Sequence, residues 1–156
     1  MRKFVVPVTA LLLWSLISSG QQKATTKPGA ETITVPLTIE GGRIFVAVRI
    51  NEKTARMLVD TGAGITVVES KFARGTAELQ RLNIVQQAGD SQASIRHLNI
   101  TLGSLTFKDQ FVGVLDMNDV SNRTGTRIDG LLGEDILGGF RSMRINFKDQ
   151  ILELEP

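Results

Sequence analysis

Short apolar stretches with β-branched residues and frequent alternation dominate the chain from residue 32 onward. Residues 32–39, 43–50 and 55–60 alternate or run apolar between short turn segments, which is typical of strands with a buried face. Further strands are expected at 65–68, 84–87, 95–102, 106–114, 144–147 and 151–154. The pattern predicts an all-β fold in one domain, with Pro36 placing the first strand at a sheet edge.

Two segments break the β pattern. Residues 69–82 carry a partial apolar face at helical spacing behind Ser70, a common N-cap residue, and predict a short helix. Residues 131–137 predict one or two helical turns that end at Gly138-Gly139. Residues 116–126 are polar and are expected to be irregular. The last two strands are expected to pair as a hairpin across residues 148–150, because a tight turn makes this pairing entropically cheap.

One acidic residue stands between two apolar runs in the segment from residue 55 to residue 69. Met-Leu-Val leads to Asp60, Thr-Gly-Ala-Gly at 61–64 forms a turn, and a second apolar run leaves it. A carboxylate between buried strands is costly unless it is hydrogen-bonded, paired or used in chemistry. Gly62 and Gly64 allow the backbone to approach the carboxylate closely. The alternative is a structural turn residue, because Asp and Gly are common in turns.

An apolar pair closed by glycine, Leu131-Leu132-Gly133, follows about seventy residues downstream. Together with the aliphatic run and the D-T-G-A at residues 60–63, this segment resembles the retropepsin-like aspartic protease family. Residues 130–156 are similar to the C-terminal part of its bacterial members, and the resemblance covers roughly residues 32–156. It implies a single retropepsin-like lobe, a closed β-barrel or sandwich with one or two short helices.

The resemblance also assigns roles to the residues of the turn. Asp60 corresponds to the catalytic residue, the Thr61 hydroxyl to a group that bonds across a dimer interface, and the Gly62 amide to a support of the carboxylate. Ala63 occupies the small fourth position. Gly64 and Glu134 replace the Asp and Arg that form an ion pair beside the turn in many retroviral members, so that ion pair cannot form here.

Substrate contacts are expected on both sides of such a site. Ala63 and Gly64 follow the catalytic turn, and Ala88, Gly89 and Asp90 lie where the family places a flap hairpin. The alternative for residues 88–92 is an ordinary hairpin tip.

The resemblance implies an aspartic endopeptidase that works as a homodimer on a peptide or protein substrate, without a metal or an organic cofactor. Each chain supplies one Asp60, and this chemistry needs two carboxylates. Asp129 could instead be a second carboxylate within one chain. Two other functions stay open: an inactive binding module of the same fold, and a non-enzymatic envelope β-domain in which D-T-G occurs by chance. In the retroviral members, the C-terminal strands of two chains interleave, which is the alternative to the expected hairpin.

Charge and composition narrow the function further. Residues 1–20 have a basic start, an apolar run and small residues, as in a signal peptide, and 21–31 read as a flexible lead-in to the domain at 32–156. Without residues 1–20 the 18 basic residues lose Arg2 and Lys3, leaving 16 against 16 acidic ones, so no nucleic-acid partner is expected. The absence of cysteine excludes disulfides and cysteine hydrolases. We expect an exported protein, periplasmic or secreted, that contacts a membrane only if the leader is an uncleaved anchor.

Overall fold

The computed structural model describes residues 31–86 and 89–156. The predicted signal peptide, residues 21–30 of the lead-in and Ala88 therefore lie outside the described residues. The strands are β1 (Ile33–Glu40), β2 (Arg43–Ile50), β3 (Lys53–Val59), β4 (Val67–Glu69), β5 (Glu78–Gln86), β6 (Gly89–Leu102), β7 (Leu105–Leu115), β8 (Gly130–Leu132), β9 (Ser142–Asn146) and β10 (Ile151–Glu155). The helices are the 3-10 turn η1 (Ser70–Phe72), α1 (Asn118–Thr124) and α2 (Glu134–Leu137).

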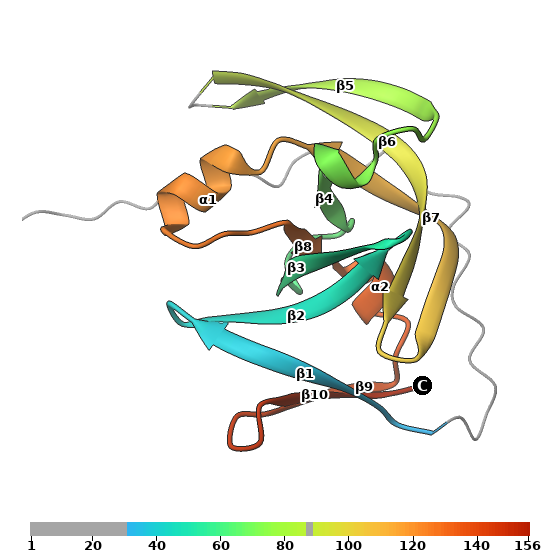
Figure 1. Ribbon diagram of the computed structural model, residues 1–156, viewed down its shortest axis with the longest axis vertical. Coiled ribbons are helices and arrows are strands. Elements are labelled where there is room, and N and C mark those ends of the chain that lie inside the picture. Colours follow the sequence, from blue (N-terminus) through green and yellow to red (C-terminus); the bar gives the residue numbers. More distant parts are fainter. Residues whose placement is uncertain (1–30, 87–88) are drawn as a thin grey trace, which may run out of the picture.

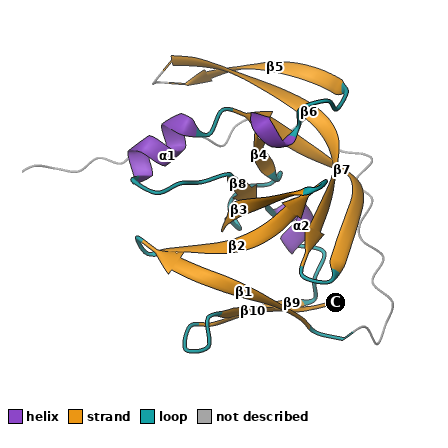
Figure 2. Ribbon diagram, viewed as in Figure 1, coloured by secondary structure: helices purple, strands orange, loops and turns teal. Residues whose placement is uncertain are grey.

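The strands form one sheet in the order β5-β6-β7-β4-β8-β3-β2-β1-β10-β9, and β6 also pairs with β2, so the sheet folds over on itself. Figure 1 shows the β5–β6 hairpin at the top, β1, β9 and β10 at the bottom, and β3, β4 and β8 between them. The helices are short, and Figure 2 shows α1 at the left of the view and α2 nearer its centre. The predicted all-β, single-lobed fold is therefore confirmed. Within the described ranges no helix is long and apolar enough to cross a membrane.

Period-two patterns build the main core, as the sequence predicts. In β1, the alternate residues Ile33, Val35 and Leu37 are buried, and they pack with the buried side chains of β2, β6 and β10. A smaller cluster lies on the opposite face of β2 and β3. It is centred on the buried residues Phe45, Met117 and Ile128. The central strands thus carry apolar side chains on both faces.

The expectation that Pro36 marks an edge strand is wrong. β1 lies between β2 and β10, but it changes partner along its length: residues 33–36 pair with β10 and residues 37–40 pair with β2. Pro36 is the last residue of the first half, where β1 has a neighbour on one side only. A missing N–H is therefore tolerated inside the sheet at this position.

The predicted helix at 69–82 is also wrong. Only η1 is helical there, Gly75 takes a positive φ of 82°, and β5 begins at Glu78. The apolar positions that suggested a helical face do not share a surface, because Phe72 is buried in the core whereas Leu79 is 51% exposed. Pairing of β5 with β6 outweighs the local spacing.

The segment expected to be irregular, 116–126, contains α1. The Asp116 carboxylate accepts a hydrogen bond from the Asn118 amide (2.8 Å), and Gly125 ends the helix with a φ of 66°. These two residues were the available sequence signals. Of the helical turns predicted at 131–137, only Glu134–Leu137 is helical, as α2, whereas residues 131 and 132 belong to the short strand β8.

The C-terminal hairpin is confirmed. β10 pairs with β9 through the register Leu152↔Ile145 and with β1 through Val35↔Leu152. Both edges of β10 are thus occupied within the same chain, and Leu152 and Leu154 are fully buried.

Candidate active site

Asp60 is the first residue after β3, at the point where β3 and β8 end side by side. These two strands are parallel, with Val59 opposite Leu132, and the Asp60 amide donates to the Leu132 carbonyl (3.1 Å). The downstream apolar pair therefore fixes the backbone that carries the carboxylate, although the two segments are about seventy residues apart in sequence.

The turn after β3 holds the Asp60 side chain with its own backbone. The Gly62 amide donates to Asp60 Oδ1 (3.0 Å), and the Ala63 amide donates to the Asp60 carbonyl (3.2 Å). Asp60 is half-buried, whereas Thr61 and Gly62 are exposed. A carboxylate that is held by an amide and open on its other side can bind a water molecule or exchange a proton.

Gly133 packs directly against this turn. A Cβ atom at Gly133 would lie 2.7 Å from the Ala63 carbonyl oxygen and 2.8 Å from the carbonyl carbon of Ile65, so only glycine fits. The next amide, of Glu134, donates to the same Ala63 oxygen (2.7 Å). A backbone bond thus stands beside the turn where the retroviral members have a side-chain ion pair.

A second carboxylate lies behind the turn. Asp135 Oδ1 accepts from the hydroxyl of the fully buried Thr66 (2.7 Å), and the Thr66 oxygen accepts from the Gly133 amide (3.1 Å). Gln110 lies 3.4 Å from Asp135 Oδ2. Burial raises the pKa of Asp135 more than these donors lower it. The sequence pattern does not single out Thr66 or Asp135. The available signal is an acid inside the apolar run after Gly133.

The sheet face that carries Asp60 is apolar beside it. Side chains alternate along β3, so Leu58 and Asp60 point to the same face, and Phe45 and Leu131 lie opposite Leu58 in the neighbouring strands. These residues belong to the smaller cluster, in which Leu58 and Leu131 are only partly buried. A partly open apolar surface therefore adjoins the carboxylate.

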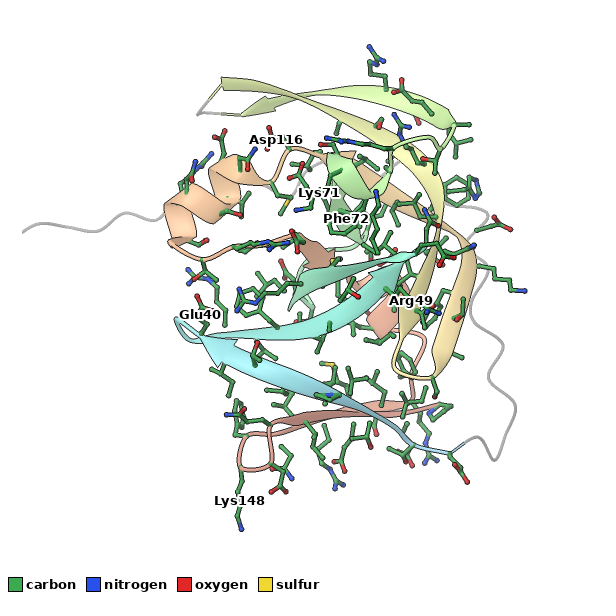
Figure 3. The ribbon with its side chains drawn as sticks, viewed as in Figure 1. Glu40, Arg49, Lys71, Phe72, Asp116 and Lys148 are labelled. Carbon is green, nitrogen blue, oxygen red and sulfur yellow. The ribbon has the colours of Figure 1, made fainter. Side chains whose placement is uncertain are left out.

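Asp129 takes part in a different arrangement. Its 2% exposed side chain contacts Lys71 Nζ (2.5 Å), the Arg127 guanidinium (2.9 Å) and the Arg56 amide (3.0 Å). Burial favours a raised pKa, but the Lys71 ammonium, the Arg56 amide and Arg127 outweigh it and lower the pKa of Asp129. Figure 3 shows Lys71 beside Phe72 on the segment between β4 and β5.

The same residue is also far from Asp60. The Asp129 amide donates to the Arg56 carbonyl, four residues before Asp60 along β3. Four residues of an extended strand span roughly 13 Å, much more than the separation of two carboxylates that share a proton. Asp129 is therefore a structural, ion-paired residue and not the intrachain partner of Asp60.

The residues expected to contact substrate are in two places. Ala63 and Gly64 adjoin Asp60, but both backbone groups of Ala63 are bonded within the site. Gly89 and Asp90 begin β6, opposite Gln86 and Val85 of the edge strand β5. In the sheet order β7, β4 and β8 lie between β6 and β3, and β6 pairs with β2 only near its other end, at residues 100 and 101. In the part of the chain that the structure describes, no three His, Asp or Glu side chains gather as a metal site.

Comparison with known proteins shows the family and the fold of this chain. A family model described as aspartyl protease matches residues 46–136, which include the Asp60 turn, β8 and most of α2. A retropepsin-like aspartic protease from Rickettsia conorii has a similar structure, with a TM-score of 0.54 and 20% identity over 83% of this chain and 95% of that one. EIAV protease in complex with the inhibitor HBY-793 gives a TM-score of 0.44 and 22% identity, over 62% and 86% of the two chains.

The search of curated proteins found no match. The family match covers more than half of the chain and includes both segments that build the site. The similarity to the Rickettsia conorii structure covers 83% of the chain. The chain belongs to the aspartyl protease family and has a retropepsin-like fold.

Proposed function

We propose that this protein is an aspartic endopeptidase whose catalytic dyad consists of Asp60 from two copies of the chain. The single observation that carries the proposal is the Asp60 turn. It presents a half-buried carboxylate that is held by the Gly62 amide and backed by Gly133, next to an apolar surface. The family match supports the same reaction class.

The homodimer follows from the chemistry of the dyad. Peptide hydrolysis of this type needs two carboxylates that share one proton, because two like charges about 3 Å apart cannot both ionise. The chain contains one D-T-G sequence, and the carboxylates of Asp129 and Asp135 are bonded elsewhere. A second copy of Asp60 is the partner that the chain itself can supply.

The reaction then needs only water. The ionised Asp60 takes a proton from a bound water, whose oxygen attacks the scissile carbonyl, while the protonated Asp60 of the other copy donates to the carbonyl oxygen. The tetrahedral intermediate collapses with cleavage of the C–N bond, and the leaving amine takes up a proton. Thr61, at the exposed end of the turn, is positioned to contact its counterpart across the dimer.

The surroundings of Asp60 favour a peptide substrate with apolar side chains at the cleaved bond. Leu58 and Leu131 lie on the carboxylate's face and are partly exposed, so a substrate side chain can bury apolar area against them. Gly64 on one side, and Gly89 and Asp90 at the start of β6 on the other, complete the proposed substrate contacts, together with Ala88, which lies outside the described residues. Removal of residues 1–20 on export is part of the same proposal and is checked by N-terminal sequencing of the secreted or periplasmic protein.

The decisive experiment compares the wild type with Asp60→Asn. The amide has the same shape but cannot act as a base or share the proton, so we expect casein hydrolysis to fall by at least about a thousandfold with no loss of melting temperature. Pepstatin should inhibit the wild type. Substantial turnover in Asp60→Asn would refute the assignment. A well-folded wild type that binds peptides but does not cleave them would identify the inactive binding module.

A further inference from the structure

The contacts behind the catalytic turn form a chain that the reaction above does not use. Thr66 is fully buried one residue before β4, and its hydroxyl joins Asp135 of α2 to the amide of Gly133. Gly133 in turn contacts the carbonyl of Ala63, inside the turn. Two segments that are about seventy residues apart in sequence therefore meet at one hydroxyl group.

Asp135 determines the orientation of the Thr66 hydroxyl. A threonine hydroxyl has a single hydrogen, and here it points to Asp135 Oδ1 (2.7 Å), which leaves the oxygen free to accept from the Gly133 amide (3.1 Å). Without an acceptor at residue 135, the hydroxyl could rotate and its lone pairs would no longer be directed at Gly133. The backing of the turn depends on the carboxylate in this way.

The ionised Asp135 is destabilising at this position, which a purely structural role would not explain. Its carboxylate is half-buried, and the groups that face it are neutral donors: the hydroxyl and backbone amide of Thr66, the Ile136 amide and the Gln110 amide. Burial raises the pKa of Asp135, so the ionised form costs stability at neutral pH. A half-buried acid whose charge is destabilising, next to the proposed catalytic turn, is a candidate for a functional role.

We propose that Asp135 is a positioning residue for the reaction: through Thr66 and Gly133 it fixes the turn that carries Asp60. This inference rests on the proposed function. Asp135 does not touch the reacting atoms. Its loss leaves the substrate-binding surface in place but lets the turn open, so the Asp60 carboxylate spends less time in its productive geometry.

The first test measures the turn itself and needs no activity. Four variants are compared by hydrogen exchange of the purified protein: Asp135→Ala, Asp135→Asn, Thr66→Val and the control Ile100→Val. Ile100 is fully buried in the core and pairs with Ile50, away from the turn. We expect the amides of residues 60–66 and 131–134 to exchange about tenfold faster in Asp135→Ala and Thr66→Val.

Asp135→Asn retains an oxygen acceptor and should recover most of the wild-type protection, because the amide can still accept from Thr66. The Ile100→Val control should lower the melting temperature without faster exchange at the turn. Unchanged exchange in Asp135→Ala would overturn the proposal. Equally fast exchange at the turn in Ile100→Val would do the same, because the effect would then be a general loss of stability.

The second test is kinetic, with active sites counted by titration with pepstatin. We expect kcat per titrated site to fall about ten- to a hundredfold in Asp135→Ala and Thr66→Val, with KM within about threefold of the wild type, and Asp135→Asn to recover most of kcat. Asp135→Asn as slow as Asp135→Ala would refute the positioning role. An inactive wild type would refute the proposed function, whereas the exchange experiment would still decide whether Asp135 orders the turn.

Discussion

The buried carboxylate of Asp129 and the half-buried carboxylate of Asp135 have opposite surroundings, and the difference separates their roles. Asp129 faces the cationic groups of Lys71 and Arg127, which lower its pKa, whereas Asp135 faces neutral donors and burial raises its pKa. The first arrangement favours the charged form and stabilises the contact between β3, η1 and the segment before β8. The second tolerates the charge at a cost, beside the proposed catalytic turn.

The ion-paired residue gives a prediction for stability. Asp129→Asn should lower the free energy of unfolding by about 2 kcal/mol at pH 7, toward the low end for a buried ion pair because Lys71 and Arg127 are 42% and 71% exposed. The folded pKa of Asp129 is lowered, so its contribution is present above the unfolded pKa and is lost as pH falls through the folded pKa.

The measurement is thermal unfolding of the wild type and the variant between about pH 3 and pH 8. This range includes the pH at which an ordinary carboxylate titrates and extends to neutrality. The gap in melting temperature should be widest near neutrality and should shrink below about pH 4. Glu52→Gln, at an exposed position in the β2–β3 turn, serves as the control. A gap that stays constant across the whole range would show that the ion pair is not its cause.

At the same scale, local sequence identified the Asp60 turn but not what supports it. The D-T-G-A sequence and its apolar flanks contain the turn chemistry within a few residues. The Thr66–Asp135 and Lys71–Asp129 contacts join residues 69 and 58 positions apart, and they depend on the parallel pairing of β3 with β8. No periodicity in a single segment carries that information.

At the scale of elements, the local sequence predicts the β9–β10 hairpin well, but it does not predict β5, whose conformation depends on its partner strand. The β9–β10 hairpin has a tight turn and two alternating strands, so local sequence specifies it. β5 has exposed side chains at residues 78–81 and a partner, β6, that determines its conformation. The helix prediction for this segment is wrong because a partial apolar face does not determine the secondary structure unless the element that packs against it is known.

The C-terminal strand supplies the prediction at this scale. β10 lies between β1 and β9, and Leu152 and Leu154 are fully buried, so deletion of residues 152–156 should expose the core and lower the melting temperature at every protein concentration. Deletion of Pro156 alone is the control, because β10 ends at Glu155. If the longer deletion left the melting temperature unchanged and produced a folded monomer, β10 would belong to the interface between chains.

At the scale of the whole molecule, the proposed site is half of what the reaction needs. Each chain presents one Asp60 at the end of β3, and a shared proton requires the second carboxylate about 3 Å away. Activity should therefore depend on association of two chains. Dilution below the dissociation constant of the dimer should reduce the activity per chain, in parallel with the dimer fraction measured by sedimentation.

A mixture of wild-type and Asp60→Asn chains tests the two-chain dyad directly. When wild-type chains exchange with an equal amount of Asp60→Asn, random pairing places half of the wild-type chains in mixed dimers, so the activity per wild-type chain should fall to about half. The expected cause is that a mixed dimer holds one carboxylate and one amide, which cannot share the proton. Addition of Asp60→Ala to a separate sample should give the same fall if it still dimerises, since it also lacks the second carboxylate. Two results would refute the two-chain dyad. They are wild-type activity that a large excess of exchanging Asp60→Asn does not change, and full activity of a chain that sediments as a monomer. One chain would then be sufficient for the reaction.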